Sequence, residues 1–271
     1  MIHKIKHLCY VLRIREQELD TVIKNLNSFY YEAASVKQKY GRPQQNKDGT
    51  YKLRTLHPST GRLKSIQAAI HSNILLKLPA PSYAFGSIKG RNNIENAKQH
   101  LGNKYFFCAD LKDFFPSINN HMVFRTFLSY GFSPTISRIL TQLTTFKGAL
   151  PQGAPTSPLV ANLVFVSTGS KILKLTEAYK ITFTTFLDDF SFSAKSDFKF
   201  LTQQILEIIK FDGYSLSHKK ITYKVKYPEI TGINISKEKM IPHFRVLSKQ
   251  QETHCPQLDR YIKQILLAKP L

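Results

Sequence analysis

Two stretches decide how this chain folds, and the first is Phe107-Cys108-Ala109-Asp110-Leu111-Lys112-Asp113-Phe114-Phe115-Pro116-Ser117-Ile118, an apolar strand that ends in Asp110. The second, Thr185-Phe186-Leu187-Asp188-Asp189-Phe190, places two adjacent carboxylates inside an alternating strand pattern. The alternation on both sides of that pair predicts a tight β-hairpin with Asp188-Asp189 at its turn. Because the two stretches are far apart along the chain, the fold must unite their carboxylates.

These carboxylates predict a metal site. Adjacent carboxylates repel one another and lose hydration unless a cation lies between them. Converging side chains of Asp110, Asp188 and Asp189 supply the oxygen ligands that Mg²⁺ prefers. Two such ions, roughly 3.5–4 Å apart, activate an attacking hydroxyl and stabilise a leaving phosphate oxygen. We interpret the three aspartates as catalytic metal ligands for two Mg²⁺ ions, with Mn²⁺ as the alternative ion. An Asp-Asp pair taken alone would indicate only a polar turn.

Composition points to a polyanionic partner. The 271 residues, 42% of them hydrophobic, are enough for one large domain or two to three small ones with a substantial core. Thirty-nine Lys and Arg residues outnumber 18 Asp and Glu residues, which gives a net charge of +21. Nucleic acid is the first candidate partner and an anionic membrane surface the second. This excess charge predicts binding that weakens strongly with salt.

Three features favour the cytoplasm. The three cysteines lack the spacing of a metal site, which predicts reduced thiols. The N-terminus has no long apolar core, so no signal peptide is expected. Between Gly148 and Ser170 the apolar run covers only about 159–166 and prolines interrupt the region, which is too short and broken for a membrane span. We therefore expect a cytoplasmic protein without a membrane partner.

Helix and strand patterns alternate along the chain. Strands are expected near 51–56, 181–194 and 221–227. Helices are expected over 1–40, from Ser59 or Thr60 to before Pro79, twice within 119–147 on either side of Gly131 and Pro134, from Pro158 through Val166, from Phe198 to near Gly213, and over 258–266. This order predicts an α+β fold with helices on one face of an antiparallel sheet.

The motifs resemble those of the reverse transcriptases. Asp110 followed by Phe115 resembles the family's motif A, Asp-x-x-x-x-aromatic. The run from Leu150 to Leu159, Leu-Pro-Gln-Gly-Ala-Pro-Thr-Ser-Pro-Leu, resembles motif B, and Phe186-Leu187-Asp188-Asp189 occupies the place of motif C. Four or more motifs follow the family's order over about residues 50–235, which is more agreement than chance gives.

Two shorter elements resemble the bacterial retron enzymes in particular. Asn96-Ala97-Lys98-Gln99-His100 precedes motif A, and Ile230-Thr231-Gly232 resembles an element implicated in recognising the enzyme's own structured RNA. By this resemblance Thr231 and Gly232 are RNA-binding residues. We interpret His100 as structural, because a lone histidine is more often a bonded core residue than a base. Leu187 is bulkier than the Ala that is frequent at this place in the retron enzymes.

The resemblance implies a right-hand polymerase. Its fingers would comprise 1–103, with an N-terminal helical region and a basic strand and helix. The palm with the aspartates would comprise 104–118 and 149–235, and a helical insertion 119–148. The thumb would comprise 236–271, which is short for the family. The thumb is either reduced or completed by RNA or a partner.

The resemblance also assigns contacts to the incoming nucleotide. Phe115 would pack under the sugar and leave no room for a 2′-hydroxyl, whereas Phe114 fits a core position better. Gln152 can donate to base or sugar, and Gly153 lacks the Cβ that would keep the backbone away from a nucleotide. The alternative for this segment is a Pro/Gly loop that only precedes a helix.

Basic residues complete this set. Arg54 resembles the fingers residue that clamps the triphosphate, a task suited to a planar guanidinium, and Lys52 lies on the same strand face. Each of them could instead be an ordinary exposed charge. Lys220 matches the motif D lysine that protonates the leaving pyrophosphate, with Lys219 as the alternative one residue earlier.

Together these features predict an RNA-directed DNA polymerase of the retron type. A primer hydroxyl would attack the α-phosphate of a dNTP. The resemblance implies a structured noncoding RNA as template and primer, priming from an internal 2′-hydroxyl, an RNA–DNA hybrid product, and antiphage defence with an effector protein. The alternatives are another prokaryotic defence or mobile-element reverse transcriptase with different priming, and a catalytically silent RNA-binding protein on the same fold.

Overall fold

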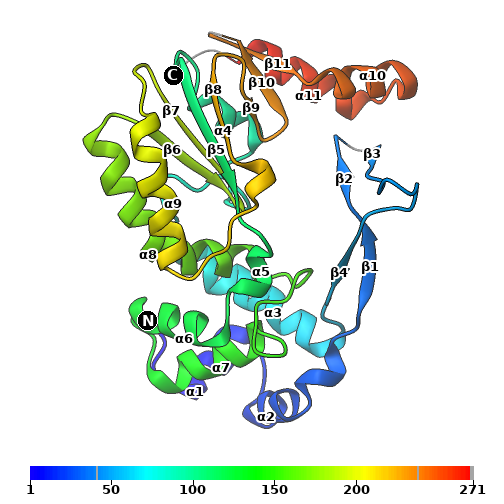
Figure 1. The fold of residues 1–271 in the computed structure, drawn as a ribbon. Coiled ribbons are helices and arrows are strands. Elements are labelled where there is room, and N and C mark those ends of the chain that lie inside the picture. Colours follow the sequence, from blue (N-terminus) through cyan, green and yellow to red (C-terminus); the bar gives the residue numbers. More distant parts are fainter. Residues whose placement is uncertain (41, 237, 269–271) are drawn as a thin grey trace. The chain divides into compact units, whose positions relative to one another are not determined.

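The computed structural model describes residues 1–40, 42–236 and 238–268. The chain divides into two compact units. The first comprises 1–37, 51–81 and 113–166, and the second comprises 38–50, 82–112 and 167–271. Both contain helices and antiparallel strands, which confirms the α+β class (Figure 1).

The first unit is mainly helical. Its helices are α1 Ile5–Leu12, α2 Glu16–Lys24, α3 Gly61–Asn73, α5 Phe114–Ser117, α6 Asn120–Ser129 and α7 Pro134–Thr144, with short 3₁₀ turns η1 Leu26–Phe29 and η2 Leu75–Lys77. The break expected near Gly131 and Pro134 is confirmed between α6 and α7. Side chains of Asn119 and Ser133 cap these two helices by accepting from the backbone N–H groups of Met122 and Ile136.

Part of the region expected to be helical is a strand. β1 Ala33–Val36 pairs antiparallel with β4 Leu53–Leu56, so the expected helix over 1–40 is correct for α1 and α2 and wrong beyond them. The residues of β1 carry little sequence signal, and their backbone groups find partners only when β4 is beside them. The strand expected at 51–56 is confirmed in β4.

The central sheet of the second unit carries the aspartates. Its order is β6 Thr182–Phe186, β7 Asp189–Ala194, β5 Tyr105–Asp110 and β8 Thr222–Val225, all antiparallel (Figure 1). Phe183 stacks on Phe192, with ring centroids 4.8 Å apart, and Phe107, Phe190 and Phe192 are buried. Burial of these rings is the main force that holds the strands in register.

The hairpin is confirmed, with its turn one residue earlier than expected. β6 ends at Phe186, β7 begins at Asp189, and these two residues are register partners. The turn is therefore Leu187-Asp188, and Asp189 is already a strand residue. The packing of Phe192 opposite Phe183 decides this, because a shift by one residue would turn the aromatic rings to the other face.

The remaining elements of the second unit form two smaller sheets, β2-β3 and β11-β10-β9, and several helices. They are β2 Gln38–Lys39, β3 Arg42–Pro43, α4 Asn93–Lys98, η3 Lys199–Leu201, α9 Thr202–Phe211, η4 His218–Lys220, β9 Glu229–Ile230, β10 Ile233–Ser236, β11 Lys239–Pro242, α10 Phe244–Thr253 and α11 Pro256–Leu267. Within the expected thumb, 236–271, residues 237 and 269–271 lie outside the described residues. A buried cluster joins α4, β5, β9–β11 and α11 through Ile94, Phe106, Ile230, Ile235, Met240 and Ile265.

Helix α8 (Ser157–Ala178) extends well beyond its expected end near Val166. By length and composition alone it is a candidate membrane span, so the expectation of a run too short to cross a membrane is corrected. However, 61% of its most apolar window is buried inside the protein. Such burial is typical of the core helix of a soluble protein.

Candidate active site

Strand pairing brings two of the three predicted metal ligands together. Asp110 is the last residue of β5, Asp189 is the first residue of β7, and they lie directly opposite each other in the register. Asp110 is buried, with only 4% of its surface exposed. Asp188 lies in the adjoining turn, where its carbonyl oxygen accepts a hydrogen bond from the Leu111 N–H at 2.9 Å. The end of β5 is thereby joined to the turn.

Lys220 forms an ion pair with Asp110. Its ammonium donates to Oδ1 of Asp110, and 61% of its side chain stays exposed. The Ser217 N–H donates to the Asp110 carbonyl at 2.8 Å, which places η4 beside the end of β5. Between the two lysines considered in this segment, Lys220 is the one that reaches the carboxylate.

The charges of this group shift two pKa values. Partial burial works to lower the pKa of Lys220, but the hydrogen bond to Asp110 and the charges of Asp110, Asp189 and Asp188 outweigh it, so the pKa is raised. Although Asp189 keeps contact with solvent, the surrounding protein desolvates its carboxyl, and Asp188 and Asp110 add negative charge. These effects raise the pKa of Asp189, and the nearby Lys220 acts against them.

A cavity of about 890 Å³ opens at this carboxylate pair. Its wall runs from Asp110, Asp189 and Lys220 to the turn at Thr231-Gly232. The wall also includes residues that the sequence did not single out, namely Lys39, Tyr40, Lys224 and Glu229. Lysine side chains beside Asp110 and Asp189 make this cavity suited to a negatively charged chain whose phosphates meet cations.

The donor chemistry around Asp110 fits a hard divalent cation. Carboxylate oxygens are the ligands that Mg²⁺ and Mn²⁺ favour, and the ammonium of Lys220 already lies against Asp110. Within residues 1–40, 42–236 and 238–268, no three His, Cys, Asp or Glu side chains are close enough to hold a metal ion as they stand. The structure thus pairs Asp110 with Asp189, and the charge of Asp188 acts on Asp189 from the adjoining turn.

The Thr231-Gly232 turn joins the two elements that resemble retron enzymes. Both residues have positive φ, 46° and 82°, and they connect β9 to β10 as a two-residue hairpin turn. The Thr231 hydroxyl donates to the Asn93 carbonyl at 3.3 Å and accepts from the Asn96 amide at 3.4 Å. A β-branched residue at positive φ is strained, so these bonds from α4 hold the turn in place.

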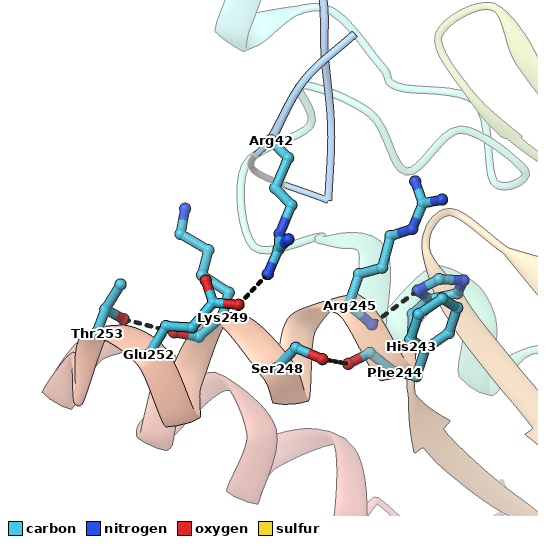
Figure 2. A network of polar contacts seen from close by, with 8 residues as sticks. All are labelled: Arg42, His243, Phe244, Arg245, Ser248, Lys249, Glu252 and Thr253. Carbon is cyan, nitrogen blue, oxygen red and sulfur yellow. Dashed lines mark hydrogen bonds and ion pairs between the residues drawn. The ribbon is translucent and has the colours of Figure 1, made fainter.

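Tyr40 lies next to the same turn, since a Cβ added at Gly232 would be 4.0 Å from its ring. Tyr40 stacks on His243 with ring centroids 3.8 Å apart and donates a hydrogen bond to Glu229. Arg42 pairs with Glu252 of α10 (Figure 2). These contacts explain why residues 38–50 belong to the second unit.

The predicted triphosphate contacts lie in the first unit. Arg54 and Lys52 are both exposed, and Arg54 is the register partner of Ser35 in β1. The Gln152 carbonyl accepts from the His57 N–H at 2.8 Å, which joins the loop of motif B to the end of β4. Gly153 has φ 108°, a conformation that favours glycine. The first unit thus joins the Arg54 strand to the Gln152-Gly153 loop.

The two phenylalanines of motif A differ in burial. Phe114 is buried and packs edge-on against Phe165, with ring centroids 6.4 Å apart, which confirms it as a core residue. Phe115 is only half-buried at the start of α5. Phe115 therefore remains accessible to a ligand.

His100 is a structural residue, as expected. It is fully buried, and its two ring nitrogens contact the hydroxyls of Ser193 and Thr184 at 2.7 and 2.8 Å. Burial lowers the pKa of His100 to about 3, so the ring is neutral. It cross-links β6 and β7 next to α4.

The chain matches the family model for reverse transcriptase (RNA-dependent DNA polymerase) over residues 44–240. It therefore belongs to the reverse transcriptase family, which implies a polymerase palm and fingers. Several of the relatives with which it aligns are retron reverse transcriptases, so the retron-type resemblance is confirmed.

Two of these relatives illustrate the similarity. The Retron Ec86 reverse transcriptase of Escherichia coli is 33% identical over 193 residues, which cover 70% of this chain and 60% of that protein. The Retron Se72 reverse transcriptase of Salmonella heidelberg (strain 579083-10) is 29% identical over 197 residues, which cover 72% and 49%. The chain thus spans about half to three fifths of the length of these relatives.

Proposed function

We propose that this protein is an RNA-directed DNA polymerase of the retron type. The single observation that carries the proposal is the pairing of Asp110 with Asp189, beside Lys220, at the wall of a large cavity in a chain of the reverse transcriptase family. The names of the retron relatives support a polymerase that copies RNA into DNA.

In this proposal Asp110, Asp188 and Asp189 hold two Mg²⁺ ions, or Mn²⁺. Bound ions would lower the pKa of a primer hydroxyl and offset the charge of the phosphates. The closed pairing of β5 with β7 orients two of these carboxylates before any ligand arrives, which reduces the cost of reorganisation. Asp188, in the turn next to Asp189, completes the set.

Lys220 serves as the proton donor to the leaving pyrophosphate. A lysine ammonium is protonated at neutral pH, and the exposed side chain of Lys220 can turn from Asp110 toward a phosphate. General acids positioned in this way typically contribute 10²- to 10⁴-fold in rate.

Residues of the first unit select the nucleotide. Arg54 and Lys52 contact the triphosphate of the dNTP, and Gln152 and Gly153 contact its base and sugar. Phe115 excludes a 2′-hydroxyl by occupying its space. In this proposal the fingers comprise 1–103, the palm 104–118 and 149–235, the helical insertion 119–148 and the short thumb 236–271.

The template and primer are a structured noncoding RNA, recognised in part at Thr231 and Gly232, and the product is an RNA–DNA hybrid. The net charge of +21 supports a polyanionic partner. By resemblance to the retron enzymes, the protein acts in the cytoplasm in antiphage defence with an effector protein.

A primer-extension assay with the full chain, an RNA template, dNTPs and Mg²⁺ tests the proposal. We expect incorporation of deoxynucleotides that disappears in the double variant Asp188→Asn, Asp189→Asn while the melting temperature stays high. RNA binding without incorporation by the native chain, even with its native RNA present, would instead support a silent RNA-binding protein. Incorporation on unrelated RNA with a free primer would favour a differently primed reverse transcriptase.

A further inference from the structure

A segment outside the recognised motifs extends the catalytic sheet. The Phe85 N–H donates to the Thr185 carbonyl, and the Thr185 N–H donates to the Tyr83 carbonyl, both at 2.8 Å. Ala84 forms a parallel bridge with the same residue of β6. Residues 83–86 therefore lie along the outer edge of β6 and lead toward its turn.

Arg91 holds this segment from the other side. Its guanidinium donates to the carbonyl oxygens of Ser82 and Ala84 at 3.0 and 2.6 Å, and it lies 5.4 Å from the ring centroid of Phe85. With both edges bonded, the backbone of residues 83–86 has little freedom to move away from β6.

Gly86 ends this segment directly against the turn that carries Asp188. A Cβ at Gly86 would lie 2.8 Å from the Leu187 nitrogen, 2.9 Å from Leu187 Cγ and 3.0 Å from the Phe186 carbonyl carbon. Real Cβ atoms are not found so close to backbone atoms, so a side chain at Gly86 would force the turn to move. Gly86 does not have a positive φ, so close approach, rather than backbone conformation, calls for glycine here.

The turn itself has little room to yield. Leu187 has φ 58°, an uncommon conformation for a branched side chain. On its far side the Asp188 carbonyl accepts from the Leu111 N–H at 2.9 Å. The Leu187-Asp188 turn is thus held between Gly86 and the residue that follows Asp110.

We propose that Gly86 is a positioning residue for catalysis: its missing side chain lets residues 83–86 press on the Leu187-Asp188 turn and set the position of the Asp188 carboxylate. This inference rests on the proposed polymerase function. Because Gly86 and Leu111 leave the turn little space to shift, Asp188 is held next to Asp189. A displacement of about 1 Å in such a group costs on the order of 10²-fold in rate.

The test compares Gly86→Ala with Gly90→Ala. Gly90 has φ 79°, and a Cβ added there would meet nothing within 4 Å, so alanine strains the backbone of the same region without touching the turn. In primer extension we expect Gly86→Ala to lower kcat by about tenfold or more, with the KM for dNTP and the affinity for RNA nearly unchanged. Binding of Mn²⁺ alone, followed by electron paramagnetic resonance, should weaken in Gly86→Ala and not in Gly90→Ala.

A second substitution tests the contact itself. Leu187→Gly removes Cγ and relieves the positive φ, so in the Gly86→Ala background it should restore part of the lost kcat and of the Mn²⁺ affinity. If Gly86→Ala alone does not fold, we expect the double variant Gly86→Ala, Leu187→Gly to fold and to be active. A double variant that is as impaired as Gly86→Ala alone overturns the proposal.

Failure of the Gly86 role is distinguishable from failure of the polymerase function. A native chain that extends no primer contradicts the polymerase function. An active native chain whose Gly86→Ala variant keeps its kcat and its Mn²⁺ affinity contradicts only the role of Gly86. An equal loss in Gly90→Ala would likewise overturn the role, because it would reduce the effect to general destabilisation.

Discussion

Lys220 donates a hydrogen bond from its ammonium to the buried carboxylate of Asp110, while most of its own side chain stays exposed. The contact exists because the chain after β5 is bonded to the segment that leads into η4, through Leu111 and Leu216. From this position Lys220 can bond the Asp110 carboxylate before substrate binds and a phosphate group afterwards. Because Lys220 makes this bond to Asp110, substitutions of Lys220 and Lys219 should have different effects.

The first prediction concerns this pair. Lys220→Gln should lower the rate of single-nucleotide incorporation by about 10²-fold, because the side chain can no longer release a proton to the pyrophosphate. Lys219→Gln removes the same charge from the same cavity wall and should change the rate little. Rapid-quench kinetics would measure both. Equal losses in the two variants would reduce Lys220 to a contributor of general positive charge.

A second prediction concerns sugar selection. Phe115→Val should admit ribonucleotides and lower the preference for dNTP over rNTP by roughly 10- to 10²-fold, because the smaller side chain leaves space for a hydroxyl. Phe114→Val is the matched control. Phe114 is buried, so its truncation should cost about 1–3 kcal/mol of stability and leave the preference intact. Unchanged discrimination in Phe115→Val would remove this residue from the nucleotide site.

Buried His100 predicts a dependence of stability on pH. Its pKa is about 3 in the folded protein and near the ordinary 6.5 when unfolded, so between these values the unfolded state binds one more proton. Stability is therefore lost as pH falls below 6.5, by up to about 1.4 kcal/mol per pH unit. Urea unfolding between about pH 7 and pH 5 should show a shallower decline for His100→Gln than for the native chain. Parallel declines would mean that other groups govern the effect.

The turn at Thr231 supports a prediction on RNA recognition. Thr231→Val keeps the shape of the side chain but removes the hydroxyl that bonds Asn93 and Asn96, at a cost of about 1–2 kcal/mol. The displaced turn should bind the protein's own structured RNA more weakly, whereas Thr231→Ser retains the hydroxyl and should bind like the native chain. Filter binding against an unrelated RNA of equal length measures the specific part. A native-like affinity in Thr231→Val would argue against recognition at this turn.

Much of the fold could be predicted because its signals are local. The apolar run that ends at Asp110, the alternation around Phe190, and the glycine and proline that separate α6 from α7 each act within a few residues. The turn of the β6–β7 hairpin lies one residue from its expected place, because packing of the aromatic rings across the strands decides the register. β1 falls where the sequence predicts helix, since its partner strand lies beyond the reach of any local pattern.

The sequence by itself determined which residue types are present for the chemistry: three aspartates in two recognisable stretches, a phenylalanine five residues after the first of them, and a large excess of positive charge. Only the tertiary structure decided that Asp110 lies opposite Asp189, that Lys220 rather than Lys219 meets them, and that Gly86 abuts the turn of Asp188. The physical reason is that spacing along a chain constrains neighbours within a turn or strand, whereas contacts between distant segments depend on how buried side chains pack and on which backbone groups remain to be paired.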